Sequence, residues 1–168
     1  MLGGADVLVI GVGNRYRGDD AVGPVTADCL RQDPPEAVTI EDHSGEGAAL
    51  IESFERTAAV IAIDAVCSDA APGTIHRFDV TREALPTAFF HYSTHAFGLA
   101  EAIETARALD RLPSRVVVYG IEGQAFELGG RMTAPVAEAA RTVASRIRAD
   151  LAGWRAGSCA EPGAEMEA

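Results

Sequence analysis

Three side chains that can bind a divalent metal or carry a proton stand at the ends of hydrophobic segments in this sequence. Asp20 follows a strand expected at residues 5–11, Asp64 directly follows the apolar run 58–63, and His95 opens a helical pattern. Two carboxylates and an imidazole suit a borderline ion such as nickel or zinc. Because sites in parallel sheets form beyond the carboxyl ends of the strands, we expect the three residues to share one rim.

The same ligand set predicts how firmly a metal is held. It contains no thiolate and no fourth protein ligand, so its affinity for a metal should be moderate. Such a site suits a metal that belongs to a substrate better than a permanent cofactor. Each residue taken alone also has an ordinary structural interpretation: Asp20 as a first-turn charge, Asp64 as a strand-end cap, and His95 as a satisfied first-turn side chain.

The elements that must position these residues alternate along the chain. Strands are expected at residues 5–11, 38–41, 58–63, 74–80 and 115–119, and helices at residues 20–32, 47–55, 95–109 and 133–154. Apolar and polar residues alternate in the segment 74–80, which indicates an edge or antiparallel strand. The pattern predicts an α/β fold, a three-layer α/β/α sandwich with a mostly parallel five-stranded sheet. Residues 1–154 form one expected domain, and 155–168 an acidic, disordered tail.

Composition excludes several classes of protein. A net charge of −11 at pH 7 gives no electrostatic footprint for nucleic acid. No apolar run is long enough to span a bilayer and no secretory signal is visible, so we expect a cytoplasmic protein. The cysteines Cys29, Cys67 and Cys159 are scattered without a Cys-x-x-Cys pair, which argues against a disulfide framework or a structural zinc site.

The glycines after the first strand do not form a dinucleotide-binding loop. That fingerprint requires a small residue three positions after Gly13, where this chain has Tyr16. Two acids, Asp19 and Asp20, also stand where a pyrophosphate would bind. Asp19 is instead expected to cap the helix that follows.

Three motifs resemble those of one enzyme family. Gly-Val-Gly-Asn at residues 11–14 and Asp-Asp-Ala-Val-Gly at 19–23 resemble the first signature of the nickel–iron hydrogenase maturation endopeptidases. Ile-Asp-Ala-Val at 63–66, with Pro-Gly-Thr at 72–74, resembles their second acidic motif. Ser-Thr-His-Ala-Phe-Gly-Leu at 93–99 is similar to their histidine motif. The motifs occur in the family's order, and the resemblance extends over residues 7–154.

The resemblance implies an endopeptidase that removes the C-terminal extension of a hydrogenase large-subunit precursor after nickel insertion. It implies a metal site of Asp20, Asp64 and His95 that recognises nickel carried by the substrate, with zinc or cadmium as possible substitutes. The nickel then acts as a Lewis acid or water activator, or it only positions the peptide while Asp19 serves as general base. The precursor is the expected partner, and the enzyme is expected to be a monomer.

One motif departs from the family pattern. The family commonly has Asp-Gly-Gly-Thr-x-Gly after the second strand, and this chain matches it only at Asp42 and Gly47. Whether His43 adds a contact to the site is left open. Of the other histidines, His76 is expected to face solvent and His91 to lie in a loop.

Two functions from other classes remain alternatives. The first is a small-molecule or peptide metallohydrolase on the same fold, which would retain its own metal. The second is a nickel-sensing chaperone that binds the loaded precursor without cutting it. Tail removal from the precursor separates both from the endopeptidase.

Overall fold

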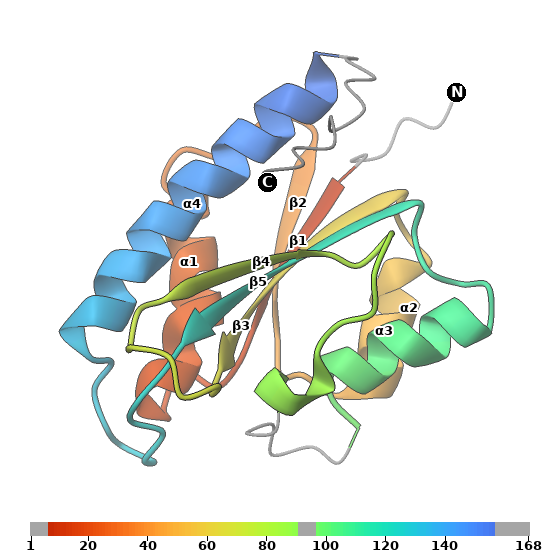
Figure 1. Ribbon diagram of the computed structural model, residues 1–168. Helices are drawn as coiled ribbons and strands as arrows, with labels where there is room; N and C mark the ends of the chain where they lie inside the picture. The colour runs from red at the N-terminus through yellow and green to blue at the C-terminus, as the bar shows by residue number, and fades with distance from the viewer. Residues whose placement is uncertain (1–6, 91–96, 157–168) are drawn as a thin grey trace, which may run out of the picture.

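The computed structural model describes residues 7–90 and 97–156 (Figure 1). In chain order its elements are β1 (Val7–Val12), the 3-10 turn η1 (Gly18–Ala21), α1 (Val22–Arg31), β2 (Val38–His43), α2 (Gly47–Phe54), β3 (Ala59–Val66), β4 (Ile75–Asp79), the 3-10 turn η2 (Thr87–Phe90), α3 (Leu99–Ala108), β5 (Arg115–Glu122) and α4 (Ala134–Arg155). The predictions for His91, His95, Cys159 and most of the tail at 155–168 concern residues outside these ranges.

The five strands form one sheet in the order β2-β1-β3-β5-β4. The first four run parallel, and β4 is antiparallel to β5. Helices α1 and α4 cover one face, and α2 and α3 cover the other (Figure 1). The predicted three-layer sandwich with a mostly parallel five-stranded sheet is therefore confirmed.

The core explains why the central strands are continuous apolar runs. Successive side chains of a strand point to opposite faces, and here both faces are covered by helices. On β1, Leu8 and Ile10 pack into the cluster under α2 and α3, whereas Val9 packs into the cluster under α1 and α4. The sheet is therefore a rigid support for the loops and side chains at the carboxyl ends of its strands.

Two element boundaries near the predicted site differ from the expected ones. β3 continues through Asp64 to Val66, because β5 extends to Glu122 and pairs with β3 beyond the end of β1. The helix expected from residue 20 begins with η1, and Asp19 makes no capping hydrogen bond to α1. The predicted helix N-cap role of Asp19 is wrong.

Helix α3 begins four residues later than the sequence indicates. Its first residue is Leu99, and the Glu101 carboxylate accepts a hydrogen bond of 3.1 Å from the Gly98 N–H. This side-chain bond satisfies a backbone donor at the helix start, which fixes the start there.

Helix α4 is the longest of the described helices, with 22 residues. It is amphipathic, since Val136, Val143 and Ile147 are fully buried against the sheet while charged residues occupy its outer side. Neither α4 nor any other helix in residues 7–90 and 97–156 is long and apolar enough to cross a membrane.

Candidate active site at the carboxyl end of the sheet

Asp20 lies on η1, directly beyond the end of β1. Its Oδ2 accepts a hydrogen bond of 2.9 Å from the Asn14 N–H. The start of α1 is pressed against the strand ends at Gly23, where a Cβ would overlap the Val12 carbonyl and lie 2.7 Å from that of Ile63. Only glycine permits this approach, which places η1 beside the residue that follows Ile63.

That residue is Asp64, and its carboxyl group interacts electrostatically with Asp20. Burial raises the pKa of Asp64 well above its ordinary value of 3.8, and the charge of Asp20 raises it further, while a hydrogen bond from the Ala65 N–H opposes the shift. Burial also raises the pKa of Asp20, partly offset by the Asn14 N–H and the charge of Arg17. Two carboxyl groups that repel each other in a partly dehydrated position favour binding of a shared cation.

The third predicted ligand cannot be placed, because His95 is outside the described residues. In residues 7–90 and 97–156 no group of three or more His, Cys, Asp or Glu side chains is arranged to hold a metal. The structure therefore brings together Asp20 and Asp64, which are two of the three predicted ligands.

The described end of the histidine motif packs against the second loop. Phe97, two residues after His95, accepts a hydrogen bond of 2.9 Å from the Gly47 N–H. Its ring occupies the space in which a Cβ of residue 47 would lie. Glu46 caps α2 by accepting from the N–H groups of Ala48 and Ala49. Gly47, one of the two positions that match the family pattern, thus joins these two motifs.

A polar pocket of about 330 Å³ opens beside Asp20. Asn14 and Tyr16 line it from the loop after β1, and His43 and Ser44 line it from the end of β2. The His43 Nδ1 accepts a hydrogen bond of 3.0 Å from the Gly45 N–H. The loop that departs from the family pattern therefore borders the same pocket as Asp20.

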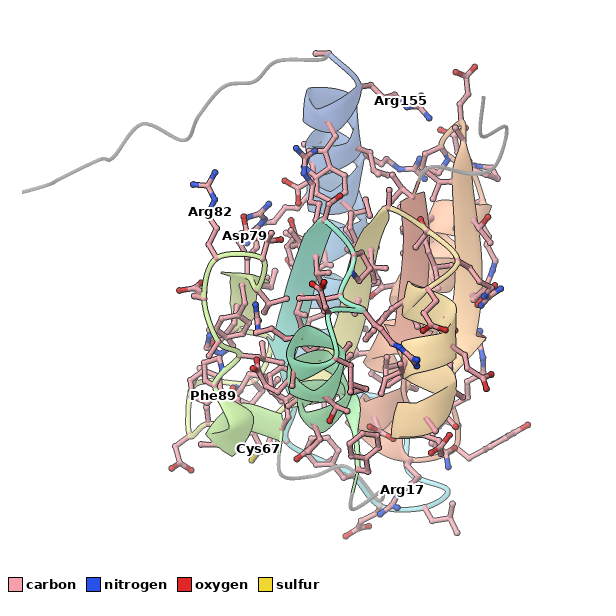
Figure 2. All side chains as sticks on the ribbon, turned by 90° about the vertical axis from the view of Figure 1, so that its right-hand side faces the viewer. Arg17, Cys67, Asp79, Arg82, Phe89 and Arg155 are labelled. Carbon is pink, nitrogen blue, oxygen red and sulfur yellow. The ribbon has the colours of Figure 1, made fainter. Side chains whose placement is uncertain are left out.

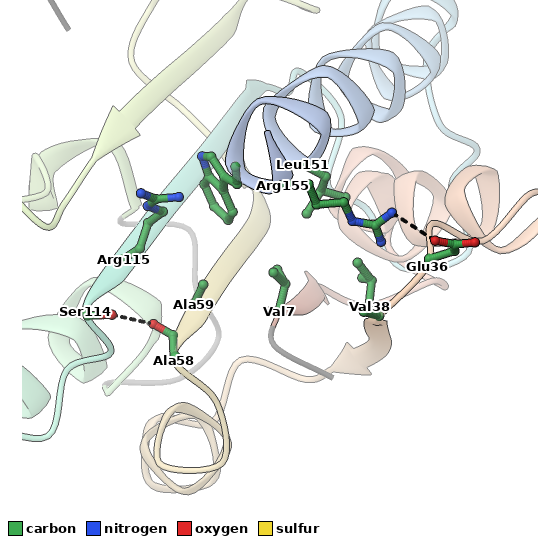
Figure 3. Close-up of a pocket in the computed structure, with 11 residues that line it drawn as sticks. Val7, Glu36, Val38, Ala58, Ala59, Ser114, Arg115, Leu151 and Arg155 are labelled. Atoms are coloured by element: carbon green, nitrogen blue, oxygen red, sulfur yellow. Dashed lines mark hydrogen bonds and ion pairs between the residues drawn. The ribbon is translucent and has the colours of Figure 1, made fainter. Parts of the chain in front are cut away.

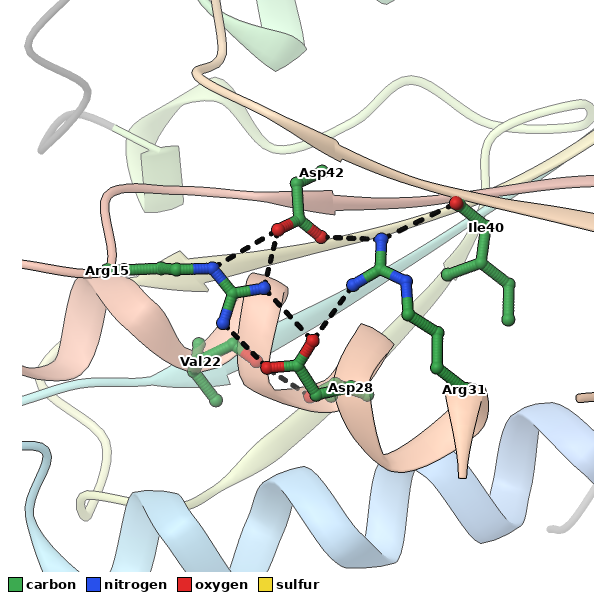
Figure 4. A network of polar contacts seen from close by, with 7 residues as sticks. Arg15, Val22, Asp28, Arg31, Ile40 and Asp42 are labelled. Atoms are coloured by element: carbon green, nitrogen blue, oxygen red, sulfur yellow. Dashed lines mark hydrogen bonds and ion pairs between the residues drawn. The ribbon is translucent and has the colours of Figure 1, made fainter. Parts of the chain in front are cut away.

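Asp42 belongs to a network of ion pairs that joins the end of β2 to α1 and to the loop after β1 (Figure 4). Arg15 contacts Asp42 at 2.5 Å and Asp28 of α1 at 2.6 Å, and Arg31 contacts the same two carboxylates at 2.9 Å each. All four side chains are 36–46% exposed, so the network adds little stability but sets the position of the loop after β1.

Asp19 points away from the pocket and is completely buried. Its Oδ2 accepts from the N–H groups of Gln124 and Ala125 at 2.8 and 3.0 Å. Its Oδ1 accepts from the Thr133 N–H at 2.7 Å, and the Thr133 hydroxyl lies 3.0–3.1 Å from both oxygens. These donors occupy the carboxylate and fasten the β5–α4 connection to η1.

A second pocket, of about 510 Å³, lies at the opposite end of the sheet (Figure 3). Its lining is largely apolar, with the Arg115 guanidinium 4.8 Å from the centre of the Trp154 ring. The one carboxylate among its described lining residues, Glu36, pairs with Arg155 at 3.5 Å. Figure 2 shows the two ends, with Arg17 at the carboxyl end and Arg155 at the amino end. The paired carboxyls make the carboxyl end the candidate active site.

Comparison with known proteins identifies the family of the chain. The family model described as HycI, hydrogenase maturation protease, matches residues 26–150. The chain belongs to the hydrogenase maturation protease family. It is therefore a hydrogenase maturation endopeptidase, and this family cleaves the C-terminus of the hydrogenase large subunit.

Individual members of the family cover most of the chain. The hydrogenase 2 maturation protease of Escherichia coli is 30% identical over 125 residues, 72% of this chain and 75% of that protein. The hydrogenase expression/formation protein HupD of Bradyrhizobium diazoefficiens is 30% identical over 135 residues, 77% of this chain and 69% of that protein. The solved structure of the hydrogenase maturating endopeptidase HybD from E. coli is 25% identical, covers 88% of this chain and 93% of that one, and has a TM-score of 0.75.

One histidine of this maturation protease lies where the sequence did not place it. His76 does not face solvent: its side chain is 20% exposed, its Nε2 is 3.3 Å from Glu122 Oε2, and its ring contacts Phe78 and Phe89. The buried Glu122 also accepts from the Ser68 N–H at 2.5 Å and the Ser68 hydroxyl at 2.8 Å.

Sequence reasoning missed Glu122 as a structural residue. The one available signal was an acid at the end of the apolar run that continues past Tyr119, where we expected the strand to stop. Near this cluster, the Cys67 N–H donates to the Phe89 carbonyl at 3.0 Å, which ties η2 to the end of β3 (Figure 2). Cys67, like Cys29, is a thiol of intermediate exposure.

Proposed function

We propose that this protease removes the C-terminal extension of a nickel–iron hydrogenase large-subunit precursor once nickel is in place, and that Asp20, Asp64 and His95 bind that nickel. The observation that carries the proposal is the pair of carboxyl groups at the carboxyl end of the sheet, each with a raised pKa. A divalent ion bound between them would relieve their repulsion.

The nickel arrives with the substrate and is held there by the precursor's own ligands. Two carboxylates and one histidine leave coordination positions that a substrate-held metal can complete. Docking then depends on nickel insertion, since about 1.4 kcal/mol of lost coordination weakens binding tenfold. Zinc or cadmium would occupy the same ligand set when supplied alone.

Two chemical roles are open to the nickel, and they differ in what the protein must supply. As a Lewis acid it polarises the scissile carbonyl or activates a water molecule, and Asp20, Asp64 and His95 only hold and orient it. As a positional checkpoint it leaves proton transfer to a protein base. The general-base role of Asp19 stays a prediction, and the four donors on its buried carboxylate support a positioning role instead.

The proposed partner is the large-subunit precursor, met in the cytoplasm by a monomeric enzyme. The net charge of −11 supports a polypeptide partner over a nucleic acid.

The test is a gel assay of tail removal from precursor matured with and without nickel, using enzyme stripped by a chelator in both arms. We expect cleavage of the nickel-loaded precursor alone, and free nickel added to the enzyme should not rescue the nickel-free precursor. Equal cleavage in both arms would contradict the nickel requirement. Metal retained at one ion per purified chain would favour the metallohydrolase alternative, and binding without cleavage the chaperone.

A further inference from the structure

Two large hydrophobic side chains stand exposed at the carboxyl end of the sheet. Tyr16 is 75% exposed in the loop after β1, and Leu128 is 77% exposed in the β5–α4 connection. In residues 7–90 and 97–156 the third exposed large hydrophobic residue is Leu109, at 55%. Leu109 lies between α3 and β5 and so belongs to the amino end.

The two loops that carry Tyr16 and Leu128 are fastened to each other. The Gly129 N–H, next to Leu128, donates to the Tyr16 carbonyl at 2.7 Å. The Asp19 N–H donates to the Ala125 carbonyl at 2.7 Å, and the Asp19 carboxylate binds the connection again near its end at Thr133. Tyr16 and Leu128 are therefore presented from a preorganised support, which lowers the entropy lost when a partner covers them.

We propose that Tyr16 and Leu128 form a docking surface for the folded body of the large-subunit precursor, beside the peptide that is cut. The inference rests on the proposed function and deepens it. Tyr16 also lines the pocket that contains Asp20, so a protein whose nickel reaches Asp20 must lie over Tyr16. Tyrosine is among the residue types enriched in binding hot spots, and Leu128 adds exposed apolar area that a partner can cover.

The charge of the chain favours the precursor over a second copy of the enzyme as occupant. Two copies would bring together chains that each carry −11. They would also cover the pocket beside Asp20 that the substrate needs. The buried Asp19 supports this surface, because its hydrogen bonds hold the loop that carries Leu128 against the loop that carries Tyr16.

The experiment compares wild-type enzyme, the double variant Tyr16→Ser/Leu128→Ser and the matched control Leu109→Ser. The control removes an exposed leucine from the other end of the sheet. For each protein, tail removal at a series of concentrations of nickel-loaded precursor gives kcat and KM, biolayer interferometry with the same precursor gives Kd, and a thermal melt checks the fold.

We expect the double variant to raise Kd and KM about tenfold, equivalent to ~1.4 kcal/mol of binding free energy. Its kcat should change much less than its KM and its Tm should be unchanged, because neither Tyr16 nor Leu128 is a proposed ligand of the nickel. Leu109→Ser should match the wild type. Wild-type Kd and KM in the double variant, or an equal loss in Leu109→Ser, would overturn the docking surface.

The failure of the docking surface is distinguishable from failure of the proposed function. Wild-type enzyme that binds the precursor and never removes its tail contradicts the protease function, while the Kd ratio still decides the docking surface. Cleavage with unchanged Kd in the double variant sinks the docking surface alone. A wild-type enzyme that neither binds nor cleaves the nickel-loaded precursor contradicts both.

Discussion

Asp19 and Asp20 are neighbours in one motif, yet their carboxyl groups meet opposite environments. Asp19 is fully buried and accepts hydrogen bonds from three backbone N–H groups and the Thr133 hydroxyl. Asp20 accepts one from Asn14, and burial raises its pKa. Donor-rich surroundings stabilise a carboxylate as part of the fold, whereas donor-poor surroundings leave its charge for an external cation.

The same contrast recurs on the neighbouring strands β3 and β5. Glu122 is buried and contacted by Ser68 and His76, which ties the end of β3 to β4. Asp64, on β3, has the Ala65 N–H as its hydrogen bond and the charge of Asp20 nearby. Hence, among the described residues of this rim, Asp19 and Glu122 hold loops together, whereas Asp20 and Asp64 are the proposed metal ligands.

The largest expected effect comes from Asp20→Asn, which removes a proposed ligand and almost no packing. Tail removal should fall about 10³-fold, the scale seen when one group that stabilises developing charge is lost. The unfolding free energy should change by less than about 1 kcal/mol. The precursor gel assay and urea unfolding measure both. Processing at the wild-type rate would contradict the assignment of Asp20 to the active site.

Asp19→Asn should show the reverse pattern. In the variant, the amide N–H₂ group faces a donor that bonds to a carboxylate oxygen in the wild type. Changing such a partner in a buried network lowers the unfolding free energy by about 3 kcal/mol. Urea unfolding gives the loss, and the folded fraction should keep kcat within about tenfold of the wild type. Unchanged stability with abolished cleavage would instead support Asp19 as general base.

A smaller effect is expected from Asp64→Asn on the pH dependence of stability. The folded-state pKa of Asp64 lies above 3.8, so the folded protein binds this proton more tightly than the unfolded chain does. Stability from this group is therefore complete below about pH 4 and is lost as the pH rises towards the folded pKa. The variant cannot ionise, so at pH 7 it should be more stable than wild type, and the difference should disappear below about pH 4. If the unfolding free energies of the two proteins depended on pH in the same way from pH 4 to 8, the raised pKa of Asp64 would be contradicted.

The positions of the proposed metal ligands Asp20 and Asp64 were predictable from the sequence, because they depend on local rules. Asp20 and Asp64 each follow a buried parallel strand, and the carboxyl ends of such strands meet at one edge. Gly23 and Gly47 also belong to recognisable motifs, but only the structure explains why glycine is required there. Backbone carbonyls approach Gly23 closely, and the Phe97 ring approaches Gly47.

The loop-holding carboxylates were not predictable. Most partners of Asp19 are backbone N–H groups more than 100 residues away, at 105 and 106 residues for Gln124 and Ala125, and any residue type except proline supplies such a donor. His76 was placed in solvent by the alternation of its strand, but β4 is covered there by η2, whose Phe89 packs on the imidazole. A strand face that is buried by a segment distant in the sequence does not show this burial in the strand's own alternation of polar and apolar residues.

The most direct test of the central claim is a crystal structure of the protein grown with zinc. The account predicts one ion bound by carboxylate oxygens of Asp20 and Asp64 and a ring nitrogen of His95, at about 2.0–2.2 Å. Asp19 should remain bonded to Gln124, Ala125 and Thr133, with no metal contact. Zinc bound elsewhere while the Asp20 and Asp64 carboxylates stay without it, or a zinc ion held by Asp19, would contradict the account.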